Sequence, residues 1–131
     1  MHNILIVEDN SQDMHQATRA LQKLGAQEIQ TTPSVAFALK HLREVAEGKK
    51  ELPDLLVLDL EFSQESGFEV LRYWKSTPSL KKMRVIVWTQ MGKLEQNIAT
   101  LFDVEQVVDK NQGIGELEKA LKDVLTLDEA S

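Results

Sequence analysis

Three runs of apolar residues restrict what this chain can fold into. ILIV at 4–7, LLVL at 55–58 and VIVW at 85–88 each hold four consecutive apolar residues. A strand with one solvent-exposed face alternates apolar and polar residues, whereas a strand of a parallel sheet that is covered on both faces does not. The three runs therefore predict central strands of a parallel sheet.

The remaining segments complete an alternation of strand and helix. Weaker strand patterns occur at 28–31 and 104–108. Apolar residues at helical spacing follow each predicted strand. They are Met14, Ala17, Leu21 and Leu24; Val35, Leu39, Leu42 and Ala46; Leu71 and Trp74; Leu94, Ile98 and Leu101; and Ile114, Leu117, Leu121 and Val124. Five such units predict an α/β fold, a three-layer doubly wound (βα)5 sandwich around a five-stranded parallel sheet.

The chain has the length of one domain. Its 131 residues are enough to build a single hydrophobic core. We expect this domain over residues 1–127 and a short C-terminal tail over residues 128–131. Ser11 is expected to cap the first helix, and Gly25 is expected to end it.

The composition argues against several classes of protein. The formal net charge of −6 argues against direct binding to nucleic acid, which depends on clustered lysine and arginine. The chain has no cysteine, which is consistent with the reducing cytoplasm. No apolar run approaches the roughly 20 residues that span a membrane, and no signal-peptide pattern is present. We therefore expect a cytoplasmic protein with neither nucleic acid nor membrane as a partner.

Polar side chains follow the predicted strands, at the point where each strand ends. They are Glu8 and Asp9 after the first strand, Asp59 after the third, Thr89 at the end of the fourth, and Asp109 and Lys110 at the fifth. In a doubly wound sheet these ends meet at one edge, where ligands bind. Glu8 and Asp9 alone are equally explained as turn residues or helix caps. Asp59 lies among apolar residues, where an unpaired carboxylate is costly.

Crowded carboxylates at this edge need a positive charge nearby. Raised pKa values, a cationic side chain or a metal ion can relieve their mutual repulsion. Lys110 supplies one charge, and Mg²⁺, which prefers oxygen ligands, would supply the rest. The sequence thus indicates a magnesium site formed by Glu8, Asp9 and Asp59.

At these positions the chain resembles a response-regulator receiver domain, the CheY-like domain of two-component signalling. The matching pieces are ILIVEDN (4–10), PDLLVLDL (53–60), Gly67, VIVWT (85–89) and VVDK (107–110). The resemblance extends from Ile4 to about Leu127. It implies a flavodoxin-like, CheY-like fold and a switch in a two-component phosphorelay.

The resemblance also implies roles for individual residues. Asp59 would accept a phosphoryl group from a histidine kinase or phosphotransfer protein. The implied Mg²⁺ ligands are Asp9, Asp59 and the backbone carbonyl of Glu61, with Glu8 acting through a bound water. Thr89 and Lys110 would bind the phosphoryl oxygens. The modified domain would present a changed surface to a downstream target protein, as a monomer or weak homodimer, and would assist only its own phosphorylation and dephosphorylation without being an enzyme.

Four positions depart from the family pattern. Val107 stands where the family usually has an aromatic residue, Asn111 replaces the proline after the lysine, and Ser63 and Gln90 replace a proline and a small residue. These departures leave an alternative open, a pseudo-receiver that binds proteins without being phosphorylated. An enzyme or nucleotide binder is disfavoured, because neither GxGxxG nor GxxxxGK[ST] occurs.

Overall fold

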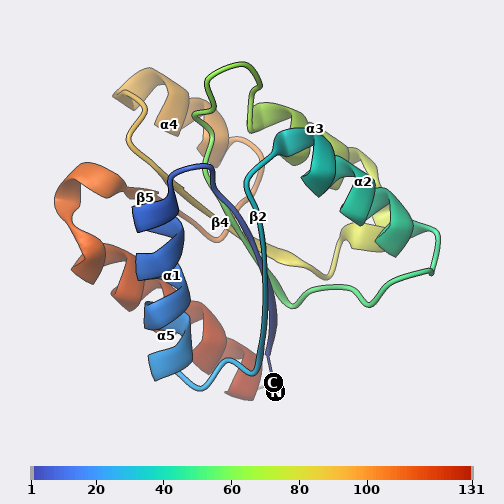
Figure 1. The fold of residues 1–131 in the computed structure, drawn as a ribbon, viewed down its shortest axis with the longest axis horizontal. Helices are drawn as coiled ribbons and strands as arrows, with labels where there is room; N and C mark the ends of the chain where they lie inside the picture. Colours follow the sequence, from blue (N-terminus) through green and yellow to red (C-terminus); the bar gives the residue numbers. More distant parts are fainter. Residues whose placement is uncertain (1, 131) are drawn as a thin grey trace.

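One parallel sheet of five strands forms the centre of the molecule (Figure 1). The structure, a computed structural model, describes the backbone of residues 2–130 and the side chains of residues 2–125. The strands are β1 (Asn3–Val7), β2 (Glu28–Thr32), β3 (Leu55–Leu58), β4 (Arg84–Thr89) and β5 (Gln106–Asp109). Their spatial order is β2-β1-β3-β4-β5, and every neighbouring pair is parallel. The predicted parallel sheet is confirmed.

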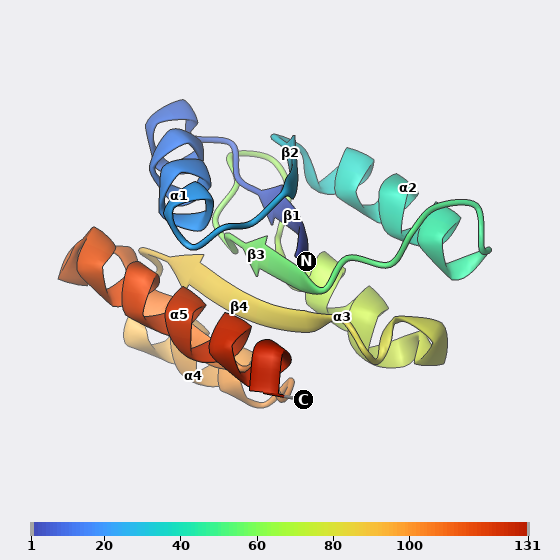
Figure 2. The same cartoon turned by 90° about the horizontal axis from the view of Figure 1, so that it is seen from below.

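Helices cover both faces of this sheet. One face carries α1 (Ser11–Lys23) and α5 (Ile114–Ala130). The other face carries α2 (Val35–Ala46) and α3 (Phe68–Ser76), as Figures 1 and 2 show, and α4 (Lys93–Thr100), whose Ala99 packs in the same core as the buried residues of α2 and α3. Two short 3₁₀ helices, η1 (Pro78–Leu80) and η2 (Lys110–Gln112), lie before β4 and after β5. The predicted three-layer α/β sandwich is therefore confirmed.

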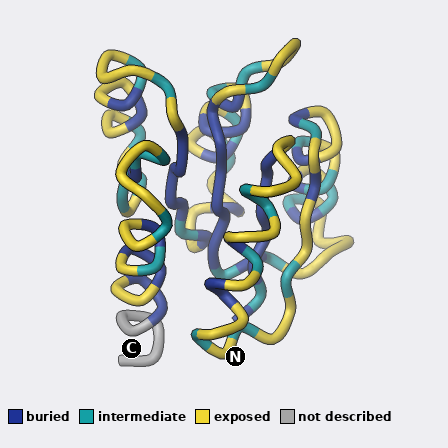
Figure 3. The backbone as a smooth tube through the Cα atoms, turned by 60° about the vertical axis from the view of Figure 1, so that its left-hand side comes forward, coloured by how far each residue is buried: buried dark blue, intermediate teal, exposed yellow. Residues whose placement is uncertain are grey.

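The apolar runs are buried because both faces of the sheet are covered (Figure 3). Successive side chains of a strand point to opposite faces. In β1, Leu5 and Val7 pack on the side of α2 and α3, whereas Ile4 and Ile6 pack on the side of α1 and α5. The strands β3 and β4 divide their side chains in the same way. Because both faces of these strands are buried, their sequence runs contain no polar residues.

The large apolar residues on and just after α4 (Lys93–Thr100) are exposed to solvent. Leu94 is 69% exposed, Ile98 is 40% exposed and Leu101, which follows the last residue of the helix, is 78% exposed. Gln96 and Ala99 are the buried residues of this helix. Helical spacing thus predicted the helix, but it did not identify the side that packs on the sheet.

Several boundaries differ from the sequence-based expectation. Asn10 caps α1, because its side chain accepts a hydrogen bond from the backbone N–H of Asp13, and Ser11 is the first helical residue. Gly25 ends this helix as expected, with a positive φ of 86°. The backbone of α5 continues through Ala130, so residues 128–130 are helical, whereas residue 131 of the expected tail lies outside the described residues. None of the helices in the described part of the chain is long and apolar enough to cross a membrane.

Candidate functional site

The strand ends enclose a hollow of about 330 Å³ at one edge of the sheet. Parallel strands bring their carboxyl ends to the same edge, which places residues far apart in the sequence side by side. The lining residues are Glu8, Asp9, Asn10, Asp13, Asp59, Glu61, Phe62, Ser63, Gln90 and Lys110. Glu8, Asp9, Asp59 and Lys110 therefore lie together as expected, whereas the side chain of Asp109 caps η2 and accepts a hydrogen bond from the backbone N–H of Asn111.

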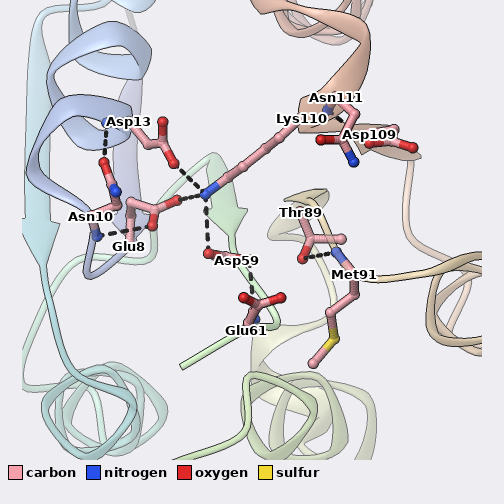
Figure 4. Close-up of polar contacts among 10 residues, drawn as sticks. All are labelled: Glu8, Asn10, Asp13, Asp59, Glu61, Thr89, Met91, Asp109, Lys110 and Asn111. Carbon is pink, nitrogen blue, oxygen red and sulfur yellow. Dashed lines mark hydrogen bonds and ion pairs between the residues drawn. The ribbon is translucent and has the colours of Figure 1, made fainter. Parts of the chain in front are cut away.

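The ammonium group of Lys110 lies at the centre of this cluster (Figure 4). Its Nζ atom lies 2.6 Å from Oε2 of Glu8, 2.7 Å from Oδ2 of Asp13 and 3.1 Å from Oδ2 of Asp59. The side chain is only 8% exposed. Burial by itself lowers the pKa of Lys110, but its hydrogen bonds to Asp13 and Glu8 and the charges of Asp59 and Glu8 outweigh burial and raise it. The lysine is thus held in its charged form.

Glu8 is the most buried acid of the cluster. Its side chain is 1% exposed, and its Oε1 atom accepts a hydrogen bond from the backbone N–H of Asn10. Burial raises the pKa of Glu8 from 4.5 to about 7, the charge of Asp59 acts in the same direction, and the contact with Lys110 opposes them only in part. This carboxyl group therefore changes its charge near neutral pH.

Three carboxylates are close enough to share a metal ion. Glu8, Asp9 and Asp59 offer ligand atoms that all lie within 4.8 Å of one another, and Glu8 and Asp59 are buried while Asp9 is exposed. An all-oxygen, anionic donor set suits a hard divalent cation such as Mg²⁺. Glu61 lies beside them, because its backbone N–H donates to Oδ1 of Asp59 at 3.1 Å. The residues present are therefore those that Mg²⁺ prefers.

Thr89 is the last residue of β4 and is not among the residues that line the hollow. It is fully buried and pairs in register with Asp109 of β5. In the described structure, its hydroxyl oxygen accepts a hydrogen bond from the backbone N–H of Met91 at 3.4 Å, as Figure 4 shows. The hydroxyl thus contacts the loop that leads to α4.

Trp88 lies on the opposite face of β4 from Thr89. It is 3% exposed and packs among the residues beneath α1 and α5. The Nζ atom of Lys110 lies 4.9 Å from the centroid of its ring. A cation at this distance from an indole is attracted by the ring. The lysine is therefore held by an aromatic ring as well as by carboxylates.

Gly67 allows the loop after β3 to fold back against the strand end. A Cβ atom at this position would lie 2.3 Å from the backbone oxygen of Asp59 and 2.6 Å from Cα of Leu60. The backbone N–H of Gly67 donates to the oxygen of Leu60 at 3.1 Å. Only glycine fits this close approach of two backbones, so the match at Gly67 has a steric reason.

Glu65 joins the same loop to α2. Its two carboxylate oxygens accept hydrogen bonds from the backbone N–H groups of Val35 and Ala36, at 3.1 and 3.0 Å. These N–H groups belong to the first turn of α2 and have no partner inside the helix. The loop that begins at Asp59 is therefore fixed to a second helix.

The sequence did not identify Asp13 or Glu65 as parts of this region. Asp13 lies in the first turn of α1, where an acid is ordinarily explained by the favourable field of the helix N-terminus. Its contact with Lys110 joins residues that are far apart in the sequence. The one available signal was its position shortly after the acidic pair Glu8 and Asp9.

The fold is a doubly wound parallel sandwich, and its strand ends carry an acidic hollow with a buried lysine. Known proteins share this combination. The model of the family described as response regulator receiver domain matches residues 4–122. The chain belongs to this family, the receiver domain of two-component response regulators.

Individual relatives agree with this assignment. The chain is 34% identical over 87 residues to the probable methanogenesis regulatory protein FilR2 of Methanothrix harundinacea (strain 6Ac), an alignment that covers 66% of the chain and 56% of that protein. The chain therefore spans little more than half the length of this relative.

Solved structures show the same fold. The Mn²⁺-bound form of response regulator Rcp1 has a TM-score of 0.78 at 24% identity, covering 95% of this chain and 91% of that one. The phosphorylated cyanobacterial phytochrome response regulator RcpA has a TM-score of 0.76 at 27% identity, covering 94% and 90%. The predicted CheY-like fold is thereby confirmed.

Proposed function

We propose that this chain is a phosphorylation-dependent switch of a two-component phosphorelay, with Asp59 as the phosphoryl acceptor. The observation that supports this most directly is the position of Asp59 at the end of β3. Its buried carboxylate lies 3.1 Å from the ammonium of Lys110 and shares a possible metal site with Glu8 and Asp9. This arrangement provides a nucleophile together with positive charge for the oxygens of a transferred phosphoryl group.

The transfer requires one bond to form and one to break. An oxygen of Asp59 attacks the phosphorus of a phosphohistidine on a histidine kinase or phosphotransfer protein, and the P–N bond breaks with its electron pair going to the histidine nitrogen. The product is an acyl phosphate on Asp59. Positioning and charge neutralisation supply most of the catalysis in such transfers. The domain assists this step and the later hydrolysis of the acyl phosphate, in which water attacks the phosphorus and the Asp59 carboxylate leaves with release of inorganic phosphate, without being a separate enzyme.

The residues around Asp59 divide the remaining tasks. Asp9, Asp59 and the backbone carbonyl of Glu61 would hold Mg²⁺, with Glu8 beside them acting through a water. When bound, the ion supplies the positive charge that lets an anionic phosphoryl group approach the carboxylates. Lys110 would turn from its carboxylate partners toward the phosphoryl oxygens, and the Thr89 hydroxyl would donate to them.

The readout would come from the elements that follow Thr89 and Lys110. Thr89 leads into the loop before α4, and Lys110 leads through η2 into α5. A small shift at either residue biases the position of these helices. The exposed apolar residues Leu94, Ile98 and Leu101 lie on or at the end of α4, where a downstream target protein would bind. The domain would act in the cytoplasm as a monomer or weak homodimer.

One observation favours a pseudo-receiver as the second candidate. Val107, on β5, pairs with Val87, so the strand lacks the aromatic ring that would respond to a movement of Thr89. A domain without this response would bind its partners in one state only, whatever happens at Asp59.

Intact-protein mass spectrometry with acetyl phosphate separates the two candidates. The chain is incubated with the phosphodonor in Mg²⁺ or in EDTA, beside the variant Asp59→Asn and the control Asp54→Asn at the opposite end of β3. We expect one added phosphoryl group in the unsubstituted chain and in the control, only with Mg²⁺, and none in Asp59→Asn. An unmodified chain under all conditions would support the pseudo-receiver.

A further inference from the structure

We propose that Asp13 is a positioning residue that holds the ammonium of Lys110 when a divalent cation occupies the acidic group formed by Glu8, Asp9 and Asp59. The inference rests on the proposed function, because it concerns the same site. It adds a fourth carboxylate with a task of its own.

The contacts of Lys110 fall into two kinds. Glu8 and Asp59 belong to the three-carboxylate group that is able to hold a metal ion. Asp13 lies outside that group, although its carboxylate is 2.7 Å from Nζ of Lys110 and so closer than that of Asp59 at 3.1 Å. A cation bound by this group would compete with the Lys110 ammonium for Glu8 and Asp59. Asp13 would remain as a partner of the ammonium.

The first turn of α1 fixes Asp13 at the rim of the hollow. The side chain of Asn10 accepts a hydrogen bond from the backbone N–H of Asp13 at 2.9 Å, which anchors this turn. The Asp13 side chain is 28% exposed, compared with 1% for Glu8 and 5% for Asp59. A carboxylate at the rim keeps more of its contact with water than the buried ones do, and the N-terminus of a helix is a favourable place for a negative charge.

Asp13 affects the affinity for the cation because it pairs with the buried positive charge of Lys110. An ammonium group as buried as that of Lys110 is costly without a carboxylate partner. Without Asp13, two outcomes remain. Lys110 would either stay bound to Glu8 and Asp59 and prevent them from binding the cation, or release them and lose all of its ionic contacts. With Asp13 present, Lys110 retains one strong partner while it yields the other two. Asp13 therefore raises the affinity of the site for the cation, and it does so through Lys110.

A double-mutant cycle measured by titration calorimetry with MgCl₂ tests this mechanism. The four proteins are the unsubstituted chain, Asp13→Asn, Lys110→Met and the double variant. We expect Asp13→Asn to raise the dissociation constant for Mg²⁺ about 5- to 10-fold when Lys110 is present. In the Lys110→Met background the same substitution removes only a direct charge effect, so we expect a change of less than about 3-fold.

Further variants exclude simpler explanations. Asp13→Glu retains the carboxylate and is expected to restore most of the affinity, whereas Asp13→Ser, measured in parallel, should behave like Asp13→Asn. Asp123→Asn removes an exposed acid from α5 and is expected to leave the affinity unchanged. Far-UV circular dichroism verifies that each variant is folded.

The outcomes separate this inference from the proposed function. Equal weakening in both backgrounds would show that Asp13 acts only by its charge, and an unchanged affinity would show that it does not act at all. Either result overturns the inference and leaves the switch intact. Failure of the unsubstituted chain to bind Mg²⁺ would overturn both.

Discussion

The Glu8 carboxyl group links the stability of the fold to pH. Its pKa is raised from 4.5 to about 7, chiefly by burial. The folded chain therefore binds more protons than the unfolded chain between these two values, so this group's contribution to stability is complete below about pH 4.5 and is lost as the pH rises through 7. We expect the free energy of unfolding in EDTA to fall by roughly 1–3 kcal/mol over this range because of Glu8.

Urea denaturation at pH 5, 6, 7 and 8 measures this effect. The difference between the unsubstituted chain and Glu8→Gln reports the contribution of this carboxyl group together with its interactions with Asp59 and Lys110. A difference in free energy that does not vary with pH would show that Glu8 ionises normally in the folded state. Asp123→Asn serves as the matched variant outside the site.

Gly67 provides a second prediction for a single residue. Its φ of −62° suits any residue, so the backbone of Asp59 and Leu60 alone excludes a side chain. We expect Gly67→Ala to lower the free energy of unfolding by about 2–3 kcal/mol. Gly115→Ala, which meets no atom within 4 Å, is the control, and urea denaturation of both variants gives the comparison. Equal stabilities would contradict the steric explanation.

The sequence identified some residues of the site and missed others for a physical reason. Glu8, Asp59 and Lys110 were predicted because each follows a strand, and the ends of parallel strands meet whatever the details of packing. Asp13 and Glu65 make contacts that depend on how a helix or loop is rotated against its neighbours. Local patterns do not encode that rotation.

The loop of residues 60–67 and helix α2 form one connected element through Glu65. Its carboxylate satisfies two N–H groups of the first turn of α2, so Glu65→Ala leaves them without that partner. We expect the amides of Val35 and Ala36 to exchange with deuterium faster, and the free energy of unfolding to fall by about 0.5–2 kcal/mol. Hydrogen exchange by NMR measures the rates.

Gln64→Ala, at the exposed neighbouring position, is the control for that prediction. Unchanged exchange of Val35 and Ala36 in Glu65→Ala would mean that water replaces the carboxylate without cost, and that the loop and the helix are independent.

Helix α4 shows where an amphipathic pattern misleads. Leu94, Ile98 and Leu101 have the spacing of a buried stripe, yet they are exposed, and the helix packs through Gln96 and Ala99. The side chain of Gln96 donates to the backbone oxygen of Met91 at 2.6 Å, which satisfies a polar group at the packed side. The periodicity of apolar residues predicts that a helix forms. Which side of the helix packs on the sheet depends on tertiary contacts such as the hydrogen bond of Gln96.

Across the whole molecule, the proposed switch predicts an uneven response to phosphorylation. The strand ends that carry Thr89 and Lys110 lead into α4 and α5, whereas β2 and α2 lie at the other edge of the sheet. We expect acetyl phosphate with Mg²⁺ to change deuterium uptake most in residues 90–112 and least in β2. Mass spectrometry of peptic peptides locates the change, with Asp59→Asn as the control. A change confined to β2 and α2 would contradict the proposed route.

The whole fold was predictable because several independent patterns agree. The uninterrupted apolar runs require helices on both faces of the sheet, and the alternation of strand and helix supplies them. Right-handed crossovers through the helices then make the strands parallel, whereas the order β2-β1-β3-β4-β5 was established by the structure. The ends of the elements were less predictable, since Asn10 rather than Ser11 caps α1 and the last helix extends beyond its apolar pattern.

The contact between Lys110 and Trp88 gives the chain an optical reporter of its own. The emission of an indole responds to the electric field across its ring, and the ammonium lies 4.9 Å from the ring centroid. We expect any event that moves Lys110 away from this ring to weaken the field across the indole and to shift its emission maximum. Trp74 donates its N–H to the backbone oxygen of Met83, and its surroundings do not include Lys110. We therefore expect the emission spectrum of the unlabelled protein to shift when Lys110 leaves the ring of Trp88, and Trp88→Phe, which leaves Trp74 as the other tryptophan, to abolish the shift.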